Sequence, residues 1–383
     1  MPSVAIVGTR GYPSYYGGFE TAVRKLAPYL VEQGWDVTVY GRPGATRSDD
    51  PSRDPRVHAI ETRGVESKSL STLSYGLTAT GQTLRRRPDV ALVMNVANGY
   101  FLPLLQMRGI PSLVNVDGIE WDRAKWGRLA KATFRGGAKM TARFATELVV
   151  DARAIGERWQ AEFGRDGIFI PYGGDPSDDL PVEPGLTRGA YALVVARFVP
   201  ENTIPEFFDA VDALGNETDV VIVGSSGYGG ELDERARQLA LTHPRVTWLG
   251  HVHDDTRLRS LWQHAGAYFH GHSVGGTNPA LVQAMAVGAP IVARDTIYNR
   301  EVLASGGLFV KPGAREIANG IRTLIADETL RLTLSADARE RAAQYYSWPS
   351  VCAAYEEALR ACADGERSPS AADASASGGA NPR

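Results

Sequence analysis

The sequence predicts an α/β protein built from two doubly wound, Rossmann-like domains that face a common cleft. Its 383 residues are enough for two domains of ordinary size. In each half, short apolar segments alternate with helical patterns, which is typical of a parallel sheet covered by helices. Residues 171–189, rich in Pro, Gly and Asp, interrupt this alternation in the middle of the chain and are predicted to be a linker.

In the first half, six apolar segments are predicted strands. They are residues 3–8, 36–40, 57–61, 89–94, 112–116 and 147–150. An amphipathic helix is expected over residues 19–33, because Val23, Leu26 and Leu30 recur at helical spacing. Gly34 then suits the end of that helix.

The second half repeats the alternation. Its predicted strands are residues 191–196, 219–224, 246–250, 267–271, 290–294 and 306–310. These patterns predict a first domain over 1–170 and a second over 190–346. A last helix, within 347–364, is expected to pack back toward the first domain. Residues 365–383 contain mainly Ser, Ala, Gly and Pro, a composition typical of a disordered tail.

Composition excludes several classes of protein. A formal net charge of −3 argues against a general nucleic-acid binder. Cys352 and Cys362 fall in one predicted helix, about 15 Å apart, which is too far for a disulfide. We therefore expect a reducing, cytoplasmic setting. The first residues lack the pattern of a signal peptide, and no apolar segment approaches the ~18 residues of a membrane span.

Glycines follow the first predicted strand. Gly8 and Gly11 lie at its end, and Gly17 and Gly18 directly precede the helix. Glycines here let a ligand approach the backbone, and the helix start offers N–H groups to an anion. A plain turn before a helix explains the pattern equally well. A dinucleotide site is not expected, because the spacing is not GxGxxG and no acidic residue ends the second strand.

Three acidic residues follow the predicted strand at 112–116. Asp117 is the candidate to hydrogen-bond a substrate hydroxyl and accept its proton, with helix capping as the alternative. Glu120 is a weaker candidate, and Asp122 is expected to be a surface charge. In the second half, Arg197 follows the strand at 191–196, where its planar guanidinium suits a diphosphate. A surface ion pair is the alternative for Arg197.

The segment 267–290 carries the strongest pattern. Gly275, Gly276, Thr277 and Asn278 lead into a helix that begins near Pro279, so their amides are placed to bind a diphosphate. His270 and His272 lie nearby, but a third metal ligand is not evident and the sequence has no DxD motif. We therefore expect no metal and no cofactor, with both histidines serving packing or substrate hydrogen bonds.

A basic stretch with aromatic residues predicts a possible partner surface. Residues 121–143 interleave seven Lys and Arg residues with Trp121, Trp126, Leu129 and Phe134, and residues 85–87 are all Arg. Such a stretch suits an anionic membrane surface, and an ordinary helix with a buried apolar face explains it equally well.

The ordered segments GTRGYPSYYGGFE, NVDGIEWDRAKW, ARFVPEN, HGHSVGGTNPALVQAMA and YNREVL span nearly the whole chain. Together they resemble the bacterial rhamnosyltransferase-like branch of glycosyltransferase family 4. The resemblance implies the GT-B architecture, with the first domain on the acceptor side and a nucleotide-sugar-binding second domain. It also implies retention of anomeric configuration and no metal requirement.

The resemblance further implies roles by position. Arg197 would neutralise the donor diphosphate, and Asp117 would contact the reacting sugar or the acceptor. The segment 276–278 would hold the phosphate and the donor sugar, and Gly17 and Gly18 would line the cleft. The loop Leu249–Val252, with His251 and Val252, would contact the nucleotide base.

Three positions depart from the family pattern. Asn202 stands where the wider family has a basic residue. Gly275 and Gln283 stand where it has two glutamates, the second of which normally binds ribose hydroxyls. Gln283 still donates and accepts hydrogen bonds, which is compatible with a deoxyribose donor.

The resulting hypothesis is transfer of L-rhamnose from dTDP-rhamnose to a lipid-linked or polysaccharide acceptor, at the inner face of the cell membrane. Two alternatives stay open. One is a sugar-nucleotide epimerase, which would return an intact nucleotide sugar. The other is a non-catalytic nucleotide-sugar-binding homologue, suggested by Gln283 and Asn202.

Overall fold

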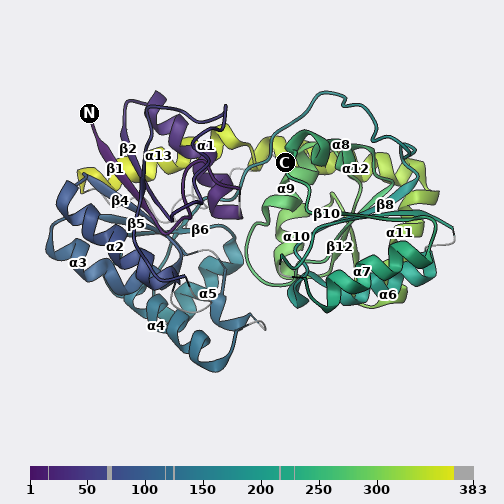
Figure 1. The fold of residues 1–383 in the computed structure, drawn as a ribbon, viewed down its shortest axis with the longest axis horizontal. Helices are drawn as coiled ribbons and strands as arrows, with labels where there is room; N and C mark the ends of the chain where they lie inside the picture. Colours follow the sequence, from purple (N-terminus) through teal and green to yellow (C-terminus); the bar gives the residue numbers. More distant parts are fainter. Residues whose placement is uncertain are drawn as a thin grey trace, which may run out of the picture. The chain divides into compact units, whose positions relative to one another are not determined.

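The computed structural model describes residues 1–15, 17–66, 71–116, 118–123, 126–214, 217–227 and 229–365. These residues form two compact α/β units (Figure 1). The first unit is built mainly from residues 1–171 and the chain from Trp348 on, and the second mainly from residues 172–347. Each unit is a parallel sheet with helices on both faces, so the predicted fold class is confirmed.

The first unit has a seven-stranded sheet in the order β3-β2-β1-β4-β5-β6-β7, paired in parallel throughout. The strands are β1 (Ser3–Val7), β2 (Asp36–Gly41), β3 (His58–Glu61), β4 (Val90–Met94), β5 (Ser112–Asn115), β6 (Glu147–Val150) and β7 (Ile168–Phe169). The six predicted strands are present, within one residue at each end. Sequence analysis missed β7, because two residues are too few to show a period.

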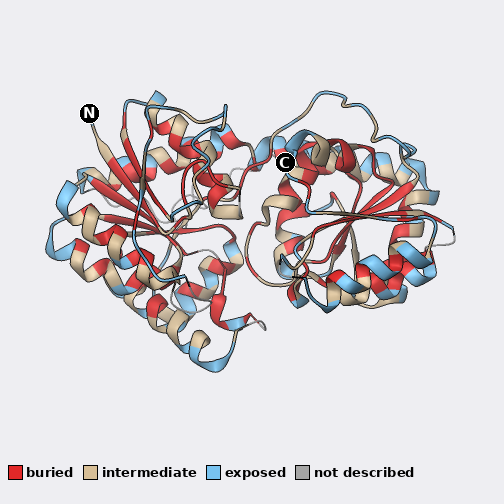
Figure 2. Ribbon diagram, in the orientation of Figure 1, coloured by how far each residue is buried: buried red, intermediate tan, exposed pale blue. Residues whose placement is uncertain are grey.

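Helices cover this sheet and bury one stripe each (Figure 2). They are α1 (Gly18–Glu32), α2 (Ser71–Arg86), α3 (Leu102–Met107), α4 (Arg128–Phe144), α5 (Arg153–Phe163) and α13 (Trp348–Asp364), with 3-10 turns η1 (Val96–Phe101) and η2 (Glu120–Asp122). In α1 the buried stripe includes Val23, Leu26 and Leu30, as their spacing predicts.

Helix α13 belongs to the first unit, although it is the last described helix of the chain. It packs against α1, β4 and β5. Buried Asn115, at the end of β5, donates from Nδ2 to the Tyr355 hydroxyl at 2.6 Å. Trp35 donates from its indole nitrogen to Glu356 at 3.2 Å. Cys352 and Cys362 are buried in this helix as free thiols.

The second unit has a six-stranded parallel sheet in the order β10-β9-β8-β11-β12-β13. The strands are β8 (Tyr191–Val195), β9 (Asp219–Val223), β10 (Val246–Gly250), β11 (Ala267–His270), β12 (Ile291–Arg294) and β13 (Leu308–Val310). The helices are η3 (Pro200–Asn202), α6 (Ile204–Leu214), α7 (Glu231–Thr242), α8 (Asp255–His264), α9 (Pro279–Ala286), α10 (Ile297–Leu303), α11 (Ala314–Ala326) and α12 (Glu328–Tyr345). Stacked Phe207 and Phe269, with ring centroids 5.3 Å apart, lie in its core.

Residues 171–189 correct the linker prediction. From Tyr172 on, this segment is part of the second unit. Leu180 receives a hydrogen bond from His264 and donates one to Gln263, and the Pro181 carbonyl accepts from Ser260 at 2.6 Å. Side chains of α8 therefore hold a segment that has no periodic pattern of its own, which is why sequence reasoning assigned it to a linker.

Candidate functional site

In both sheets the strand order reverses next to the first strand. The reversal lies between β1 and β4 in the first unit and between β8 and β11 in the second. In an open parallel sheet, the loops that leave such a pair of strands diverge at their carboxyl ends and form a binding crevice. The residues that follow β8 and β11 are therefore the first candidates for a site in the second unit.

Hydrogen bonds hold the loops after β8 and β11 together. The Thr203 hydroxyl donates to the Gly271 carbonyl at 2.5 Å, and the Ser273 amide donates to the Glu201 carbonyl at 2.9 Å. Arg294, at the end of β12, donates to the Thr203 hydroxyl at 2.9 Å. The two loops thus form one rigid edge on which functional side chains are held in place.

Asn202 has a role that explains its departure from the family pattern. Its Nδ2 donates to the Arg197 carbonyl at 2.8 Å, and its Oδ1 lies 2.7 Å from Nδ1 of His272. The amide thereby links the β8 loop to the β11 loop, which requires a donor and an acceptor on one side chain. A lysine offers donors alone and would leave His272 without this partner.

The Arg197 side chain is exposed at this edge, immediately after β8. Burial lowers the pKa of His272 well below its ordinary value, and the neighbouring positive charges, Arg197 among them, lower it further. Asn202 is hydrogen-bonded both to the Arg197 carbonyl and to the His272 ring, which brings these two residues to one place. The two residues lie 75 positions apart in the sequence, and they follow β8 and β11, which are neighbours in the sheet.

His270 is buried at the end of β11, and the choice between packing and a substrate hydrogen bond stays a prediction. Only 4% of it is exposed, its Nδ1 lies 3.0 Å from the Tyr268 hydroxyl, and burial lowers its pKa to about 3. It is therefore neutral at physiological pH. Within the described residues, no three His, Cys, Asp or Glu side chains come together as a metal-binding group.

The start of α9 has fewer amide donors than its sequence suggested. Asn278 is the N-cap, and its side chain accepts from the Ala280 amide at 2.9 Å, while Pro279 has no N–H. Donors for an anion must therefore come from the turn before the helix, at Gly275, Gly276 and Thr277. Gly275 has φ +113°, a backbone conformation that residues other than glycine rarely adopt. A glutamate at this position would be strained.

Gln283 is hydrogen-bonded to the backbone of Asp175, and its donor-binding role stays a prediction. Its Oε1 accepts from the Asp175 amide at 3.1 Å and its Nε2 donates to the Asp175 carbonyl at 2.8 Å. Both ends of the side-chain amide are thus engaged by the backbone. A glutamate could not form this pair, because it has no N–H to offer the carbonyl. Gln283 ties residues 174–175 to α9, and a ribose would have to compete with that pair.

His251 and Val252 follow β10, two strands away from β8 in the sheet. Val252 is buried and His251 is exposed. The ring centroids of His251 and His253 lie 4.2 Å apart. Partial desolvation of the His251 ring lowers its pKa, and the neighbouring His253 lowers it further. These residues lie at the same carboxyl edge as Arg197, and their contact with a nucleotide base stays a prediction.

In the first unit, Gly17 is the N-cap of α1 and is extended, with φ −168°. Gly18 is the first residue of the helix. Sequence analysis did not single out Glu20, a buried carboxylate that accepts from the Arg10 amide at 3.0 Å and from the Thr9 hydroxyl at 3.3 Å. A glutamate three residues after an N-cap was the available signal. Glu20 fixes the path of the loop after β1.

The acidic segment after β5 is described in part. Asp117 lies outside the described residues, so its proposed role stays a prediction. Glu120 is buried and accepts from the Trp126 indole at 2.8 Å. Asp122 is exposed and ion-paired with Arg158, which confirms it as a surface charge.

Comparison with known proteins matches each half of the chain to a glycosyl transferase model. Residues 179–341 match the model for glycosyl transferases group 1, and residues 17–173 match the glycosyl transferase 4-like domain. Over 213 residues the chain is 32% identical to phosphatidyl-myo-inositol mannosyltransferase of Mycolicibacterium smegmatis, and the match covers 52% of this chain and 53% of that protein. The chain thus spans about half the length of the curated relatives it matches.

Two solved structures share the fold. Sucrose-phosphate synthase from Thermosynechococcus elongatus superposes with a TM-score of 0.75 at 20% identity, covering 94% of this chain and 98% of that one. HepE from Anabaena, solved in complex with UDP, superposes with a TM-score of 0.71 at 18% identity, covering 94% and 100%.

We predict that Gln283→Glu destabilises the second unit at neutral pH. The new carboxylate would face the Asp175 carbonyl, losing one hydrogen bond and adding repulsion, at a cost of about 1–3 kcal/mol. Thermal unfolding followed by circular dichroism measures the change. Gln160→Glu, at an exposed position of α5, is the matched control. Equal unfolding temperatures for the two variants would contradict the pairing.

A second prediction concerns pH. Because the folded state holds His270 neutral while the unfolded chain binds a proton below pH 6.5, the free energy of unfolding should fall as pH drops from 6.5 toward 3. The contribution is about 1.4 kcal/mol per pH unit. His270→Gln should remove this contribution. The free energy of unfolding measured with urea should then change less steeply between pH 7 and pH 5 than it does in the unaltered protein. Parallel slopes for the two proteins would contradict the neutral buried state.

Proposed function

We propose that this chain, a glycosyltransferase by its two matched domains, moves a sugar from a nucleoside diphosphate to a hydroxyl group of a glycolipid or polysaccharide. The observation that carries the proposal is the edge formed after β8 and β11. There Arg197 and the turn 275–277 place a guanidinium and backbone amides on loops that are hydrogen-bonded together. This arrangement suits the negative charge that develops on a departing diphosphate.

The donor we propose is dTDP-rhamnose, on the strength of the ordered motifs in the sequence. Structures of HepE with UDP and with UDP-glucose support a nucleoside diphosphate sugar as the donor class. The curated relatives are mannosyltransferases that act on phosphatidyl-myo-inositol, which supports a lipid-linked acceptor and makes mannose the competing sugar.

In the reaction we propose, the bond between the anomeric carbon and the diphosphate oxygen breaks. A bond from that carbon to the acceptor oxygen forms on the same face, so the configuration is retained. The acceptor proton passes to the departing phosphate, which gains charge as the bond breaks. Arg197 would stabilise this charge without a metal ion. The neutral His272 would help to position the Arg197 loop, because both are hydrogen-bonded to Asn202.

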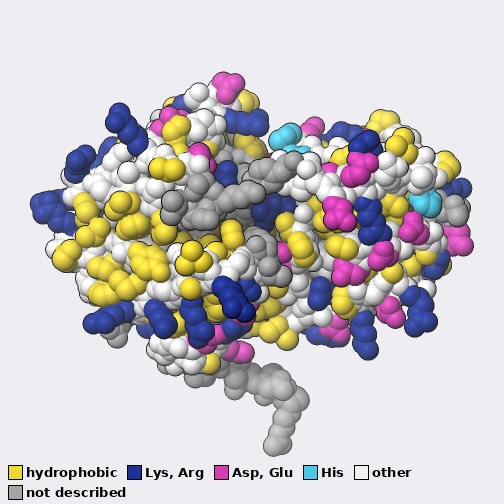
Figure 3. Space-filling model, turned by 60° about the horizontal axis from the view of Figure 1, so that its bottom comes forward, with side chains coloured by type: hydrophobic (Ala, Val, Ile, Leu, Met, Phe, Trp, Pro, Cys, Tyr) yellow, Lys and Arg dark blue, Asp and Glu magenta, His cyan; other side chains and the backbone are white. Residues whose placement is uncertain are grey.

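One face of the first unit supports a peripheral position on an anionic membrane. Figure 3 shows hydrophobic side chains gathered over its helices, with Lys and Arg along the margin. On the helices of the first unit, the exposed large apolar residues are Leu77 of α2, Tyr100 of η1, Met107 of α3 and Leu129 of α4, and the exposed basic residues of α4 are Arg128, Arg135, Lys139 and Arg143. Among the described helices, none combines the length and apolar character of a bilayer span. Apolar anchors with a basic rim suit attachment to a surface.

To test the reaction, we would measure nucleotide release from dTDP-rhamnose, GDP-mannose, UDP-glucose and UDP-GlcNAc in the presence of EDTA. We predict release from dTDP-rhamnose when acceptor lipid is supplied. Arg197→Gln should lower kcat about a hundredfold or more, because a charged donor to the leaving group is lost. Arg245→Gln, at an exposed arginine of the same unit, is the control.

Each failure has its own meaning. An epimerase would return an intact sugar nucleotide with an altered sugar and no free diphosphate. Binding of a donor without release would indicate the non-catalytic alternative. Equal rates for the Arg197 and Arg245 variants would contradict the proposed role of Arg197.

The membrane face gives a separate prediction. Leu129→Asp should weaken binding to phosphatidylglycerol vesicles about tenfold in a sedimentation assay, since an 83% exposed apolar anchor is lost and a negative charge is added. Leu332→Asp, at a 60% exposed leucine of α12, is the matched control. Equal binding of the two variants would contradict the use of this face.

A further inference from the structure

Asn299 is a buried amide near the start of α10, and it belongs to the motif YNREVL, which the proposed reaction leaves without a role. Only 3% of the residue is exposed. Its backbone amide donates to the capping hydroxyl of Thr296 at 3.0 Å. The backbone that carries the Asn299 side chain is therefore fixed.

The side chain of Asn299 joins the loop after β11 to the end of β12. Its Nδ2 donates to the His272 carbonyl at 3.0 Å and to the Arg294 carbonyl at 2.8 Å. Both partners are carbonyl oxygens, which accept and cannot donate, so the amide nitrogen has to face them. An ionised aspartate has a similar shape but no donor, and it could form neither hydrogen bond.

The His272–Ser273 peptide is held at both of its polar groups. Asn299 donates to its carbonyl, while its N–H, which belongs to Ser273, donates to the Glu201 carbonyl at 2.9 Å. Because a peptide is planar, fixing its C=O and its N–H fixes the orientation of the whole plane. One residue later the chain enters the turn 275–277, so these contacts set the direction in which it enters.

The contacts of Asn299 extend to the loop after β8. Arg294, whose carbonyl Asn299 holds, donates from its side chain to the Thr203 hydroxyl at 2.9 Å. The His272 ring in turn contacts Asn202 at 2.7 Å. Hydrogen bonds thus connect β12 and α10 to the loops after both β11 and β8.

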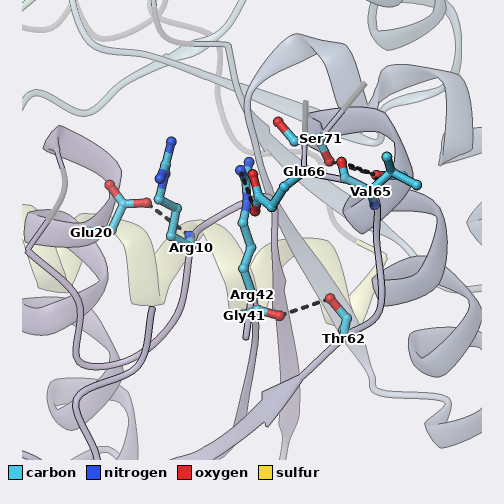
Figure 4. Close-up of polar contacts among 9 residues, drawn as sticks. Arg10, Glu20, Gly41, Arg42, Thr62, Val65, Glu66 and Ser71 are labelled. Atoms are coloured by element: carbon cyan, nitrogen blue, oxygen red, sulfur yellow. Dashed lines mark hydrogen bonds and ion pairs between the residues drawn. The ribbon is translucent and has the colours of Figure 1, made fainter. Parts of the chain in front are cut away.

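Loops of the first unit are joined in a different way. The Arg42 amide donates to the Arg10 carbonyl at 2.7 Å, which is a contact between backbones. Glu20 accepts from the Arg10 amide (Figure 4), but it lies on the helix that follows the same strand, β1. Asn299 differs because it lies after β12 and holds the loop of the neighbouring strand β11.

We propose that Asn299 is a positioning residue for sugar transfer: it orients the His272–Ser273 peptide so that the turn 275–277 presents its amides to the donor diphosphate. It acts through the His272 carbonyl and not on the substrate. Donors to a developing charge must lie at hydrogen-bond distance, so a displacement of about 1 Å is enough to slow the reaction. The inference rests on the proposed function and assigns a role to YNREVL within it.

The test compares Asn299→Asp with two controls in the full chain. Asn299→Asp keeps the shape and places a carboxylate oxygen against two carbonyls. Thr296→Val removes the cap of α10 and leaves the Nδ2 contacts of Asn299 in place, so it controls for lost stability. Asn319→Asp, at an exposed position of α11, controls for added charge. Asn299→Ala, which removes the amide and adds no charge, is measured alongside and should change as Asn299→Asp does.

Two measurements separate positioning from a structural role. Hydrogen–deuterium exchange without ligand should become about tenfold faster in residues 271–277 of Asn299→Asp, with a smaller change in Thr296→Val and none in Asn319→Asp. Calorimetry with dTDP, UDP and GDP should show binding about tenfold weaker in Asn299→Asp, for whichever nucleotide the unaltered protein binds, and within about twofold in both controls. The kcat for nucleotide release should fall in parallel.

Equal exchange of residues 271–277 in Asn299→Asp and Thr296→Val would overturn the proposal, because a merely structural residue would loosen the loop no more than its cap does. Faster exchange with unchanged nucleotide binding would overturn it too, since the held peptide would then not position the donor. The proposed function fails separately: if the unaltered protein binds none of the three nucleotides while Asn299→Asp still loosens the turn, the transferase proposal falls and the hold of Asn299 on the loop stands.

Discussion

All the strand pairs of both sheets are parallel, and this arrangement determines which loops meet. A parallel sheet brings the carboxyl ends of all its strands to one edge, so loops distant in sequence meet there. In the second unit this constraint brings the loop of Arg197 against the loop of His272, and in the first it joins Arg10 to Arg42. The chemistry of each unit follows from which side chains its strands deliver to that edge.

The departures from the family pattern are connected by hydrogen bonds that the usual residues would not make. Asn202 links two loops because an amide both donates and accepts, and Gln283 pairs with a backbone amide and carbonyl for the same reason. Gly275 has a positive φ that a glutamate would strain. At Asn202 and Gln283, hydrogen bonds stand in place of the charges that the resemblance implies, and we propose that Arg197 supplies most of the positive charge for the donor diphosphate.

Much of the fold was predictable, because strands and amphipathic helices are marked by apolar patterns within a short stretch of the sequence. The twelve expected strands and the helix at Gly18–Glu32 are present within about two residues of their predicted bounds. The pairing of Gln283 with Asp175 was not predictable, since it joins residues 108 positions apart through a segment without a period. Glu20 was missed for a related reason, since its contacts are with Arg10 and Thr9, 10 and 11 positions earlier in the chain.

We propose that a nucleoside diphosphate binds at the edge after β8 and β11. Hydrogen–deuterium exchange on the full chain, with and without saturating dTDP or UDP, would locate the bound nucleotide. We expect slower exchange in residues 197–203 and 271–282, with no change in the helices at the opposite end of the second unit's sheet. Unchanged exchange in both loops at saturating nucleotide, or protection confined to other parts of the chain, would contradict it.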